Sequence, residues 1–210
     1  MPEILTIAGP NGASYCIEDP GGRVGSKLRN GEPYERKLLH DVNNLRPTGA
    51  AFDVGAHVGN HSLWFAAVCG LKVHAWEPYP ESLRRLRLNL ALNPNLDITV
   101  HPWAAGAETG RGRISGGMTI QLDRGDIPVY RIDDHLAVDD LAVVKVDVEG
   151  MEPHALIGML GHLERCSPVI YTECHSRAAH AAVAEVLEPL DYQVDKTIQM
   201  GSTMERWRRG

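Results

Sequence analysis

The stretch AAFDVGAHVGNHSLWFAA, Ala50 to Ala67, decides the fold because it joins an apolar run to a glycine-containing turn and then to helix-forming residues. Ala50–Val54 predicts a buried strand, and Val58–Cys69 predicts a helix. Gly55 and Gly59 lie in the turn, where glycine lets a backbone approach a neighbour or ligand closely. Such a turn is either a bare strand-to-helix connection or part of a nucleotide-type binding site.

Strand-like and helix-like segments alternate after this turn, which predicts an α/β fold with a doubly wound, mostly parallel sheet. The predicted strands are Ala50–Val54, Lys72–Trp76, Ile98–Trp103, Leu141–Val148, Val169–Glu173 and Tyr192–Thr197. The predicted helices between them are Val58–Cys69, Pro80–Leu92, Pro153–Leu163 and Arg177–Leu187. Residues 107–128 are glycine-rich and interrupt the alternation, so we expect a loop or small insertion there.

The chain has 210 residues, which predicts one domain: a β-rich N-terminal cap over residues 1–31 and a Rossmann-like core over residues 32–210. Two short apolar stretches in the cap, Ile4–Ala8 and Tyr15–Ile17, predict a small hairpin or an irregular segment. The segment from Pro33 to Leu45 has apolar residues at helical spacing.

Composition narrows the class of protein. The chain is 43% hydrophobic and 23% charged, as an ordinary globular protein is, and its net charge is −6. A negative charge disfavours a nucleic-acid partner, since phosphate binding needs a positive surface. No apolar run reaches the ~18 residues of a membrane span, and the four cysteines show no C-x-x-C spacing, so we expect a cytoplasmic protein with reduced thiols and no membrane partner. The oligomeric state stays open.

An acid lies at the end of the second predicted strand, in KVHAWEP (Lys72 to Pro78). In adenosine-type cofactor sites, an acid ~20 residues after the glycine turn accepts hydrogen bonds from the two ribose hydroxyls. Glu77 follows the turn at this spacing. The pair of signals favours a ligand site over a bare turn.

The turn itself indicates which cofactor binds. Dinucleotide sites use Gly-x-Gly-x-x-Gly, whereas the middle glycine is replaced here by His57. The carboxylate of Asp53 precedes the turn, and it would repel a pyrophosphate but suit a ligand with a cationic amine. S-adenosylmethionine has ribose hydroxyls, an ammonium and a sulfonium and no phosphate, so the charge pattern favours it over NAD.

Four segments together resemble the FkbM-type methyltransferases, which are class I S-adenosylmethionine enzymes. They are FDVGAHVGNHS, VHAWEPYPESLRRLRLNLALN, ITVHPWAAGAETG and VVKVDVEGMEPHALIG, and KVDVEGME is the most specific part. The resemblance implies a seven-stranded Rossmann-like sheet whose last hairpin, Tyr192 to Arg209, is antiparallel. It also implies O-methylation of sugars or natural-product scaffolds. His57 and His61 depart from the family, where we expect Asn and a hydroxyl or aromatic residue.

The cofactor site predicted from these signals has three parts. Asp53 and the turn would hold the methionine end, Glu77 with Pro78 the ribose, and the Trp103–Ala105 stretch the adenine. The predicted cofactor-binding residues are Asp53, Gly55, Ala56, His57, Gly59, Asn60, His61, Glu77, Pro78, Trp103, Ala104, Ala105 and Asp147.

A group of acids gives the second chemical clue. Strand alternation puts Lys145, Asp147 and Glu149 on one face of a central strand, where buried charges are costly unless they pair or bind a ligand. One interpretation is a Lys145–Asp147 ion pair with a solvated Glu149; another is that both acids reach the cofactor pocket, and both can hold. Glu173 and His175 end the next strand and should lie at the same rim.

Methyl transfer requires an aligned acceptor and removal of its proton. We therefore predict Asp147, Glu149 and His175 as catalytic residues, with Asp147 first, then Glu149. A Mg²⁺ ion held by Asp147, Glu173 and a neighbour is an alternative that we do not favour, and we predict no metal site.

The sequence thus predicts an S-adenosylmethionine-dependent methyltransferase that modifies a hydroxyl of a small-molecule acceptor. A nicotinamide-binding oxidoreductase on the same sheet and a non-catalytic cofactor-binding partner protein are the alternatives.

Overall fold

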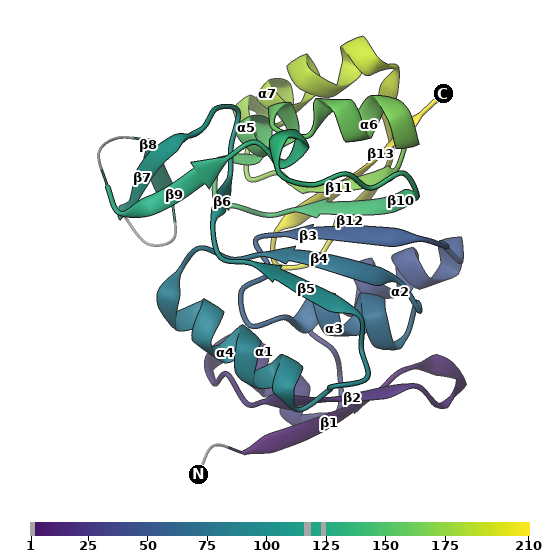
Figure 1. Cartoon of the computed structure of the whole chain (residues 1–210). Helices are drawn as coiled ribbons and strands as arrows, with labels where there is room; N and C mark the ends of the chain where they lie inside the picture. Colours follow the sequence, from purple (N-terminus) through teal and green to yellow (C-terminus); the bar gives the residue numbers. More distant parts are fainter. Residues whose placement is uncertain (1–2, 116–118, 123–124) are drawn as a thin grey trace.

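The chain forms a seven-stranded sheet with helices on both faces, in a computed structural model that describes residues 3–115, 119–122 and 125–210 (Figure 1). The strand order is β12-β13-β11-β10-β3-β4-β5, and all neighbouring pairs are parallel except the two that β13 makes. The strands are β3 (Ala50–Val54), β4 (Lys72–Trp76), β5 (Ile98–His101), β10 (Leu141–Val146), β11 (Val169–Glu173), β12 (Tyr192–Gln199) and β13 (Thr203–Arg209). The predicted fold class and its antiparallel last hairpin are confirmed.

Apolar residues on both faces explain why the central strands are buried. Every residue of β3 is buried, as expected of a parallel strand covered on both sides. One face packs against α5 (Glu152–Ile157), α6 (Leu160–Cys166) and α7 (Arg177–Leu187), and the other against α2 (Arg36–Leu45), α3 (Asn60–Ala67) and α4 (Pro80–Ala91) (Figure 1). The switch between the two helix layers puts the carboxyl ends of β3 and β10 side by side.

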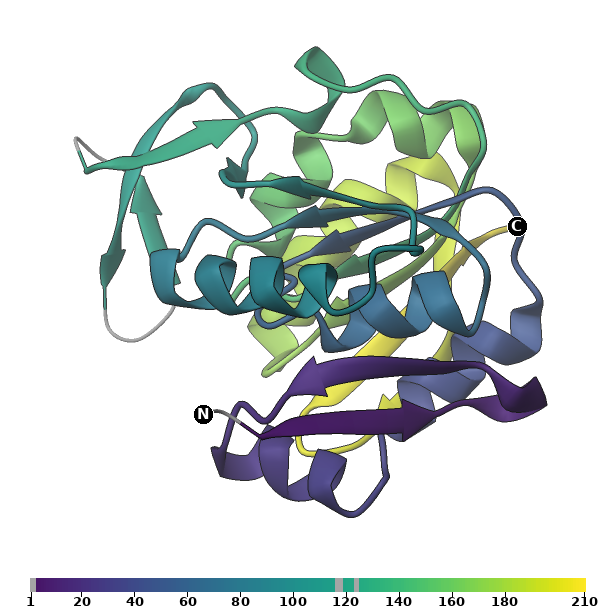
Figure 2. The same ribbon diagram turned by 60° about the horizontal axis from the view of Figure 1, so that its bottom comes forward.

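The N-terminal hairpin, β1 (Ile4–Ala8) and β2 (Ser14–Glu18), lies against α3 and α4 on one side of the sheet (Figure 2). Two asparagines, one in α4 and one just after it, hold the free edge of β2: Asn89 of α4 accepts from the Glu18 amide at 2.7 Å, and Asn93 accepts from the Cys16 amide at 2.8 Å. The predicted hairpin is therefore present, and helix α1 (Gly22–Arg29), which the glycine-rich sequence did not predict, follows it.

Several predicted boundaries differ. Strand β5 ends at His101, before Pro102, which has no amide hydrogen to donate to a ladder. The single helix predicted over Pro153–Leu163 is two helices, α5 and α6. They separate at Gly158, where the carbonyl of Gly106 approaches so closely that a Cβ would collide with it.

Most of the described part of residues 107–128 is sheet rather than loop. Strands β7 (Gly110–Ser115), β8 (Thr119–Leu122) and β9 (Ile127–Tyr130) join β6 (Ala104–Ala105) in a four-stranded sheet of order β6-β9-β7-β8. This small sheet projects beyond the carboxyl ends of the main strands (Figure 1), while residues 116–118 and 123–124 lie outside the described residues.

Within the part of the chain that the structure describes, no helix has the length and apolarity needed to cross a bilayer.

Candidate functional site

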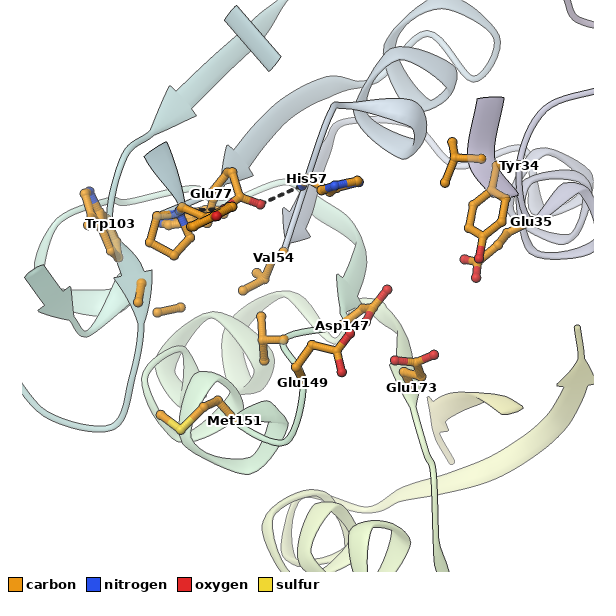
Figure 3. Close-up of a pocket in the computed structure, with 18 residues that line it drawn as sticks. Tyr34, Glu35, Val54, His57, Glu77, Trp103, Asp147, Glu149, Met151 and Glu173 are labelled. Atoms are coloured by element: carbon orange, nitrogen blue, oxygen red, sulfur yellow. Dashed lines mark hydrogen bonds between the residues drawn. The ribbon is translucent and has the colours of Figure 1, made fainter. Parts of the chain in front are cut away.

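A cavity of about 320 Å³ opens at the carboxyl ends of β3, β4, β10 and β11, where ligands bind in doubly wound sheets (Figure 3). Glu77 and Trp103 lie at one end of it, and Tyr34 and Glu35 lie opposite Asp147 and Glu173 at the other. The lining residues are Val24, Tyr34, Glu35, Val54, Gly55, His57, Trp76, Glu77, Pro78, Tyr79, Trp103, Ala104, Ala105, Asp147, Val148, Glu149, Met151 and Glu173.

The glycine turn forms the floor of the cavity. Gly55 has a φ of 85°, and a Cβ there would collide with the carbonyl oxygen of Asp147, so only glycine fits between the ends of β3 and β10. His57 also has a positive φ, 51°, and its side chain lines the cavity. Burial lowers the pKa of His57, which favours its neutral form.

Glu77 is 3% exposed and reaches the cavity from the end of β4. One carboxylate oxygen accepts from the amide of His57 at 2.8 Å and the other from the amide of Tyr79 at 2.7 Å (Figure 3). Each oxygen retains capacity for another donor, because a carboxylate has about four acceptor sites. Burial raises the pKa of Glu77 to about 7, against the effect of the two amides.

The end of the cavity next to Glu77 is apolar. The Trp103 ring meets Trp76 edge-on at 5.8 Å and Tyr130 edge-on at 5.5 Å, which fixes its orientation. Ala104 and Ala105 form β6, and both line the cavity, as does Met151. Two small residues and a large aromatic ring leave room for a flat group next to Glu77.

Lys145 lies beneath the cavity with 1% of its side chain exposed. Its ammonium donates to the Gly55 carbonyl at 3.0 Å and lies 3.3 Å from an oxygen of Asp147 and 3.5 Å from one of Asp53. Burial opposes its charge, but the carboxylates of Asp147 and Asp53 outweigh burial and raise the pKa of Lys145. The predicted Lys145–Asp147 ion pair is present.

Asp53 does not reach the cavity, which corrects its predicted direct contact with the methionine end. Its side chain is fully buried below the turn, where one oxygen accepts from the Ser62 hydroxyl at 2.5 Å and the other faces Lys145. The register of β3 against β10 explains where the Asp53 side chain lies, because Asp53 is the direct neighbour of Lys145 across the two strands. Asp53 therefore supports the floor of the cavity.

Four more residues that we predicted to contact the cofactor lie outside the cavity lining: Ala56 and Gly59 of the turn, and Asn60 and His61 at the start of α3. Asn60 donates from its amide group to the Tyr34 carbonyl at 3.1 Å, and Nε2 of His61 lies 3.0 Å from Glu35 in an electrostatic contact off hydrogen-bond geometry. These contacts place Tyr34 and Glu35, lining residues that the sequence did not indicate.

The segment KVDVEGME positions the remaining acids. Strand β10 ends at Val146, and the chain turns at Glu149 and Gly150, which have φ of 54° and 97°. Glu152 is 3% exposed and accepts from the amides of Val148 at 3.0 Å and Gly150 at 3.1 Å. Glu149 is thereby held on a defined loop, and not on the strand face with Lys145 and Asp147 as the alternation predicted.

Asp147, Glu149 and Glu173 meet at the cavity end opposite Trp103 (Figure 3), and His175 contacts Glu173 there. Glu173 is 8% exposed, lies 3.0 Å from Nε2 of His175 and is hydrogen-bonded to Asp147. Burial and the adjacent Asp147 carboxylate raise the pKa of Glu173, while Lys145 and the Glu173 hydrogen bond overcome burial and lower that of Asp147. The two opposite shifts favour the ionised form of Asp147 and the protonated form of Glu173. Glu149 is half-exposed, and His175 lies outside the cavity lining, behind Glu173.

Asp147, Glu149 and Glu173 each offer an oxygen within 4.8 Å of the others, a grouping that resembles a divalent-metal site. Lys145 already pairs with Asp147 and would compete with a cation there, and burial with the adjacent Asp147 raises the pKa of Glu173, which disfavours its ionised form. We assign no metal to this cluster.

Comparison with known proteins identifies the family. The model of the methyltransferase FkbM domain matches residues 53–194, more than half of the chain. The hexuronic acid methyltransferase AglP of Haloferax volcanii is 32% identical to this chain, in an alignment that covers 76% of this chain and 69% of that protein.

Two solved structures share the fold. The methyltransferase FkbM from Methylobacillus flagellatus superposes with a TM-score of 0.63 at 24% identity, over 83% of this chain and 46% of that one, so this chain spans about half of that protein's length. Fibrillarin from Aeropyrum pernix, crystallised with natively bound S-adenosyl-L-methionine, superposes with a TM-score of 0.53 at 13% identity, over 99% of this chain and 100% of that one. From the family model and the Haloferax relative, we conclude that this chain belongs to the FkbM family of methyltransferases, as its motifs predicted.

Proposed function

We propose that the protein uses S-adenosylmethionine to methylate a hydroxyl of a small molecule such as a sugar or a natural-product scaffold. The observation that carries this proposal is the charge of the cavity. Five carboxyl groups line it, from Glu35, Glu77, Asp147, Glu149 and Glu173, and no lysine or arginine is among its described lining residues. A cationic adenosine derivative without phosphate fits such a lining, whereas the pyrophosphate of NAD would be repelled.

The described residues fit the parts of that cofactor in order. Glu77 would accept hydrogen bonds from the ribose hydroxyls with its remaining acceptor sites, and Pro78 would pack beside it. Trp103, Ala104 and Ala105 would enclose the adenine. Gly55 and His57 would lie along the methionine end, with Asp147 facing the cationic groups. Asp53, Ala56, Gly59, Asn60 and His61 would shape this surface from behind.

When bound, the sulfonium supplies an electrophilic methyl group, so the protein must chiefly position the acceptor and take up its proton. Asp147 is the residue that we expect to orient donor and acceptor, since Lys145 holds its carboxylate ionised and in place. Glu149, on the loop that follows β10, would also contact the acceptor. The Haloferax relative's name supports a sugar as the acceptor class.

A thermal-shift experiment tests the cofactor. S-adenosylmethionine and S-adenosylhomocysteine should raise the melting temperature, since a ligand at 100 times its Kd stabilises the folded state by ~2.7 kcal/mol, and NAD should leave it unchanged. Stabilisation by NAD alone would favour the oxidoreductase alternative.

Turnover separates the enzyme from a non-catalytic binding protein. Incubation with cofactor labelled in the methyl group and a panel of monosaccharides, uronic acids and glycosides should label at least one acceptor hydroxyl. Cofactor binding with no labelled product from the panel or from a small-molecule cell extract would favour a silent binding protein.

A further inference from the structure

Glu173 differs from the other two acids at the acceptor end of the cavity. It ends β11 beside the end of β10, with its side chain enclosed, and it touches both Asp147 and His175. Asp147 forms an ion pair with Lys145, and the Glu149 side chain is 52% exposed. Of the three, Glu173 alone is enclosed at the cavity, free of a lysine partner, and connected to an imidazole.

His175 gives Glu173 a route to solvent. Its Nε2 lies 3.0 Å from Glu173, and 51% of its side chain is exposed. A proton that reaches Glu173 from inside the cavity can therefore leave through the imidazole to water. Neither Asp147, which pairs with Lys145, nor Glu149, which lies 3.9 Å from Nε2 of His175, has a comparable contact.

Resting on the function proposed above, we propose that Glu173 is the catalytic residue that takes the proton from the acceptor hydroxyl, and that His175 is a positioning residue that holds Glu173 and passes the proton to water. In this step the acceptor oxygen forms a bond to the methyl carbon, the carbon–sulfur bond breaks with its electron pair left on sulfur, and the hydroxyl proton moves to the Glu173 carboxylate. The sulfonium charge is lost as the carboxylate is neutralised, so atoms and charge balance.

The charges around Glu173 determine whether its carboxyl group is ionised and can accept a proton. Burial and the adjacent Asp147 carboxylate raise the pKa of Glu173, whereas Lys145, 3.3 Å from Asp147, lowers that of Asp147, so Glu173 is the acid of the pair that favours its protonated form. A cationic ligand should lower the pKa of Glu173 and release that proton, so the base forms only in the loaded site. The groups that face Glu173 are Asp147, Glu149, His175, Tyr34, the Ser202 hydroxyl and, through Asp147, Lys145.

Calorimetry in buffers of different ionisation enthalpy measures this proton directly, without turnover. Near neutral pH, binding of S-adenosylmethionine to the wild-type protein should release a substantial fraction of one proton, and the uncharged sulfur of S-adenosylhomocysteine should release less. Glu173→Gln should bind the cofactor and release fewer protons than the wild type, since among the described lining residues only Glu77, whose pKa burial raises to about 7, remains as a proton source. The exposed control Glu185→Gln on α7 should release as much as the wild type.

Turnover supplies the second readout. Glu173→Gln should lower kcat by ~10²–10⁴-fold, the usual contribution of a general base, with a KM for the cofactor close to wild type. Glu173→Asp should recover part of that loss, and His175→Asn should lower kcat less and shift the pH profile. Circular dichroism and melting curves identify any variant that fails to fold.

Each result decides between the two proposals. Proton release by Glu173→Gln equal to that of the wild type, or an unchanged kcat, would overturn the role of Glu173 while leaving the proposed function intact. If the wild-type protein binds no S-adenosylmethionine, the proposed function fails and this inference fails with it.

Discussion

The ammonium of Lys145 lies 3.3 Å from a carboxylate oxygen of Asp147, with Lys145 buried beneath the cavity and Asp147 in its lining. Since Lys145 also contacts Asp53 and the Gly55 carbonyl, one buried cation ties the glycine turn of β3 to the acidic end of β10. The ion pair thus connects the parts of the site that would bind the cofactor and the acceptor.

Removal of Lys145 should destabilise the fold. Lys145→Met leaves the buried Asp53 and the partly buried Asp147 without their cation, and loss of one partner from a buried pair costs ~3–5 kcal/mol. Urea unfolding measures the free energy. The exposed Lys72→Met on β4 serves as the control and should change it little. A loss below ~1 kcal/mol for Lys145→Met would contradict the account of this pair.

Glu152 should hold the loop that carries Glu149. Glu152→Ala removes the acceptor for the amides of Val148 and Gly150, and the loss of these part-buried hydrogen bonds should cost ~0.5–1.5 kcal/mol each. Hydrogen exchange at these two amides should accelerate, while Glu164→Ala, an exposed change on α6, should leave them protected. Equal protection in both variants would show that the loop does not depend on Glu152.

The stacked imidazoles of His74 and His101 should make the fold sensitive to acid. Burial, with the neighbouring His74, lowers the pKa of His101 to about 4, and burial lowers that of His74. Because the folded state favours the neutral rings, their contribution to stability is full above the unfolded pKa of ~6.5 and is lost as the pH falls toward 4.

His101→Phe keeps a ring against Trp76, on which His101 stacks at 4.4 Å, and removes the titration. The variant should lose on the order of 2 kcal/mol less stability than the wild type between pH 7 and pH 4.5. His154→Phe, at an exposed site on α5, is the matched control and should follow the wild type. Parallel pH curves for His101→Phe and the wild type would count against this origin of the sensitivity.

Metal chelation should have no effect on binding or turnover. Because Lys145 pairs with Asp147 and burial disfavours the ionised form of Glu173, EDTA should leave kcat unchanged and Mg²⁺ should not raise the melting temperature. Loss of activity in EDTA that Mg²⁺ restores would assign the metal site that we reject.

Local patterns were sufficient for most of the sheet. The bounds of β3, β4, β11 and α7 match the sequence prediction, because each is an apolar segment delimited by glycine, proline or a capping serine. Glu77, Trp103 and Asp147 were placed in the cavity correctly for the same reason, since parallel strands bring their carboxyl ends to one edge.

The remaining site residues depend on contacts between distant segments. Alternation gives the face of a strand but not the depth below a turn, so Asp53 was assigned to the ligand when its partners are Lys145 and Ser62. Tyr34 and Glu35 precede α2 and reach the cavity only because Asn60 and His61 of α3 hold them. No local pattern encodes such a pairing.

The most direct test of the central claim is a crystal structure of the protein with S-adenosylhomocysteine, supported by calorimetry of Glu77→Gln. The account predicts the ligand in the cavity with its ribose hydroxyls on the Glu77 carboxylate, and about a 10–100-fold loss of affinity in Glu77→Gln, as expected for hydrogen bonds to a charged group. The exposed control Glu81→Gln should bind as the wild type does. An empty cavity in the soaked crystal, or undiminished affinity in Glu77→Gln, would contradict it.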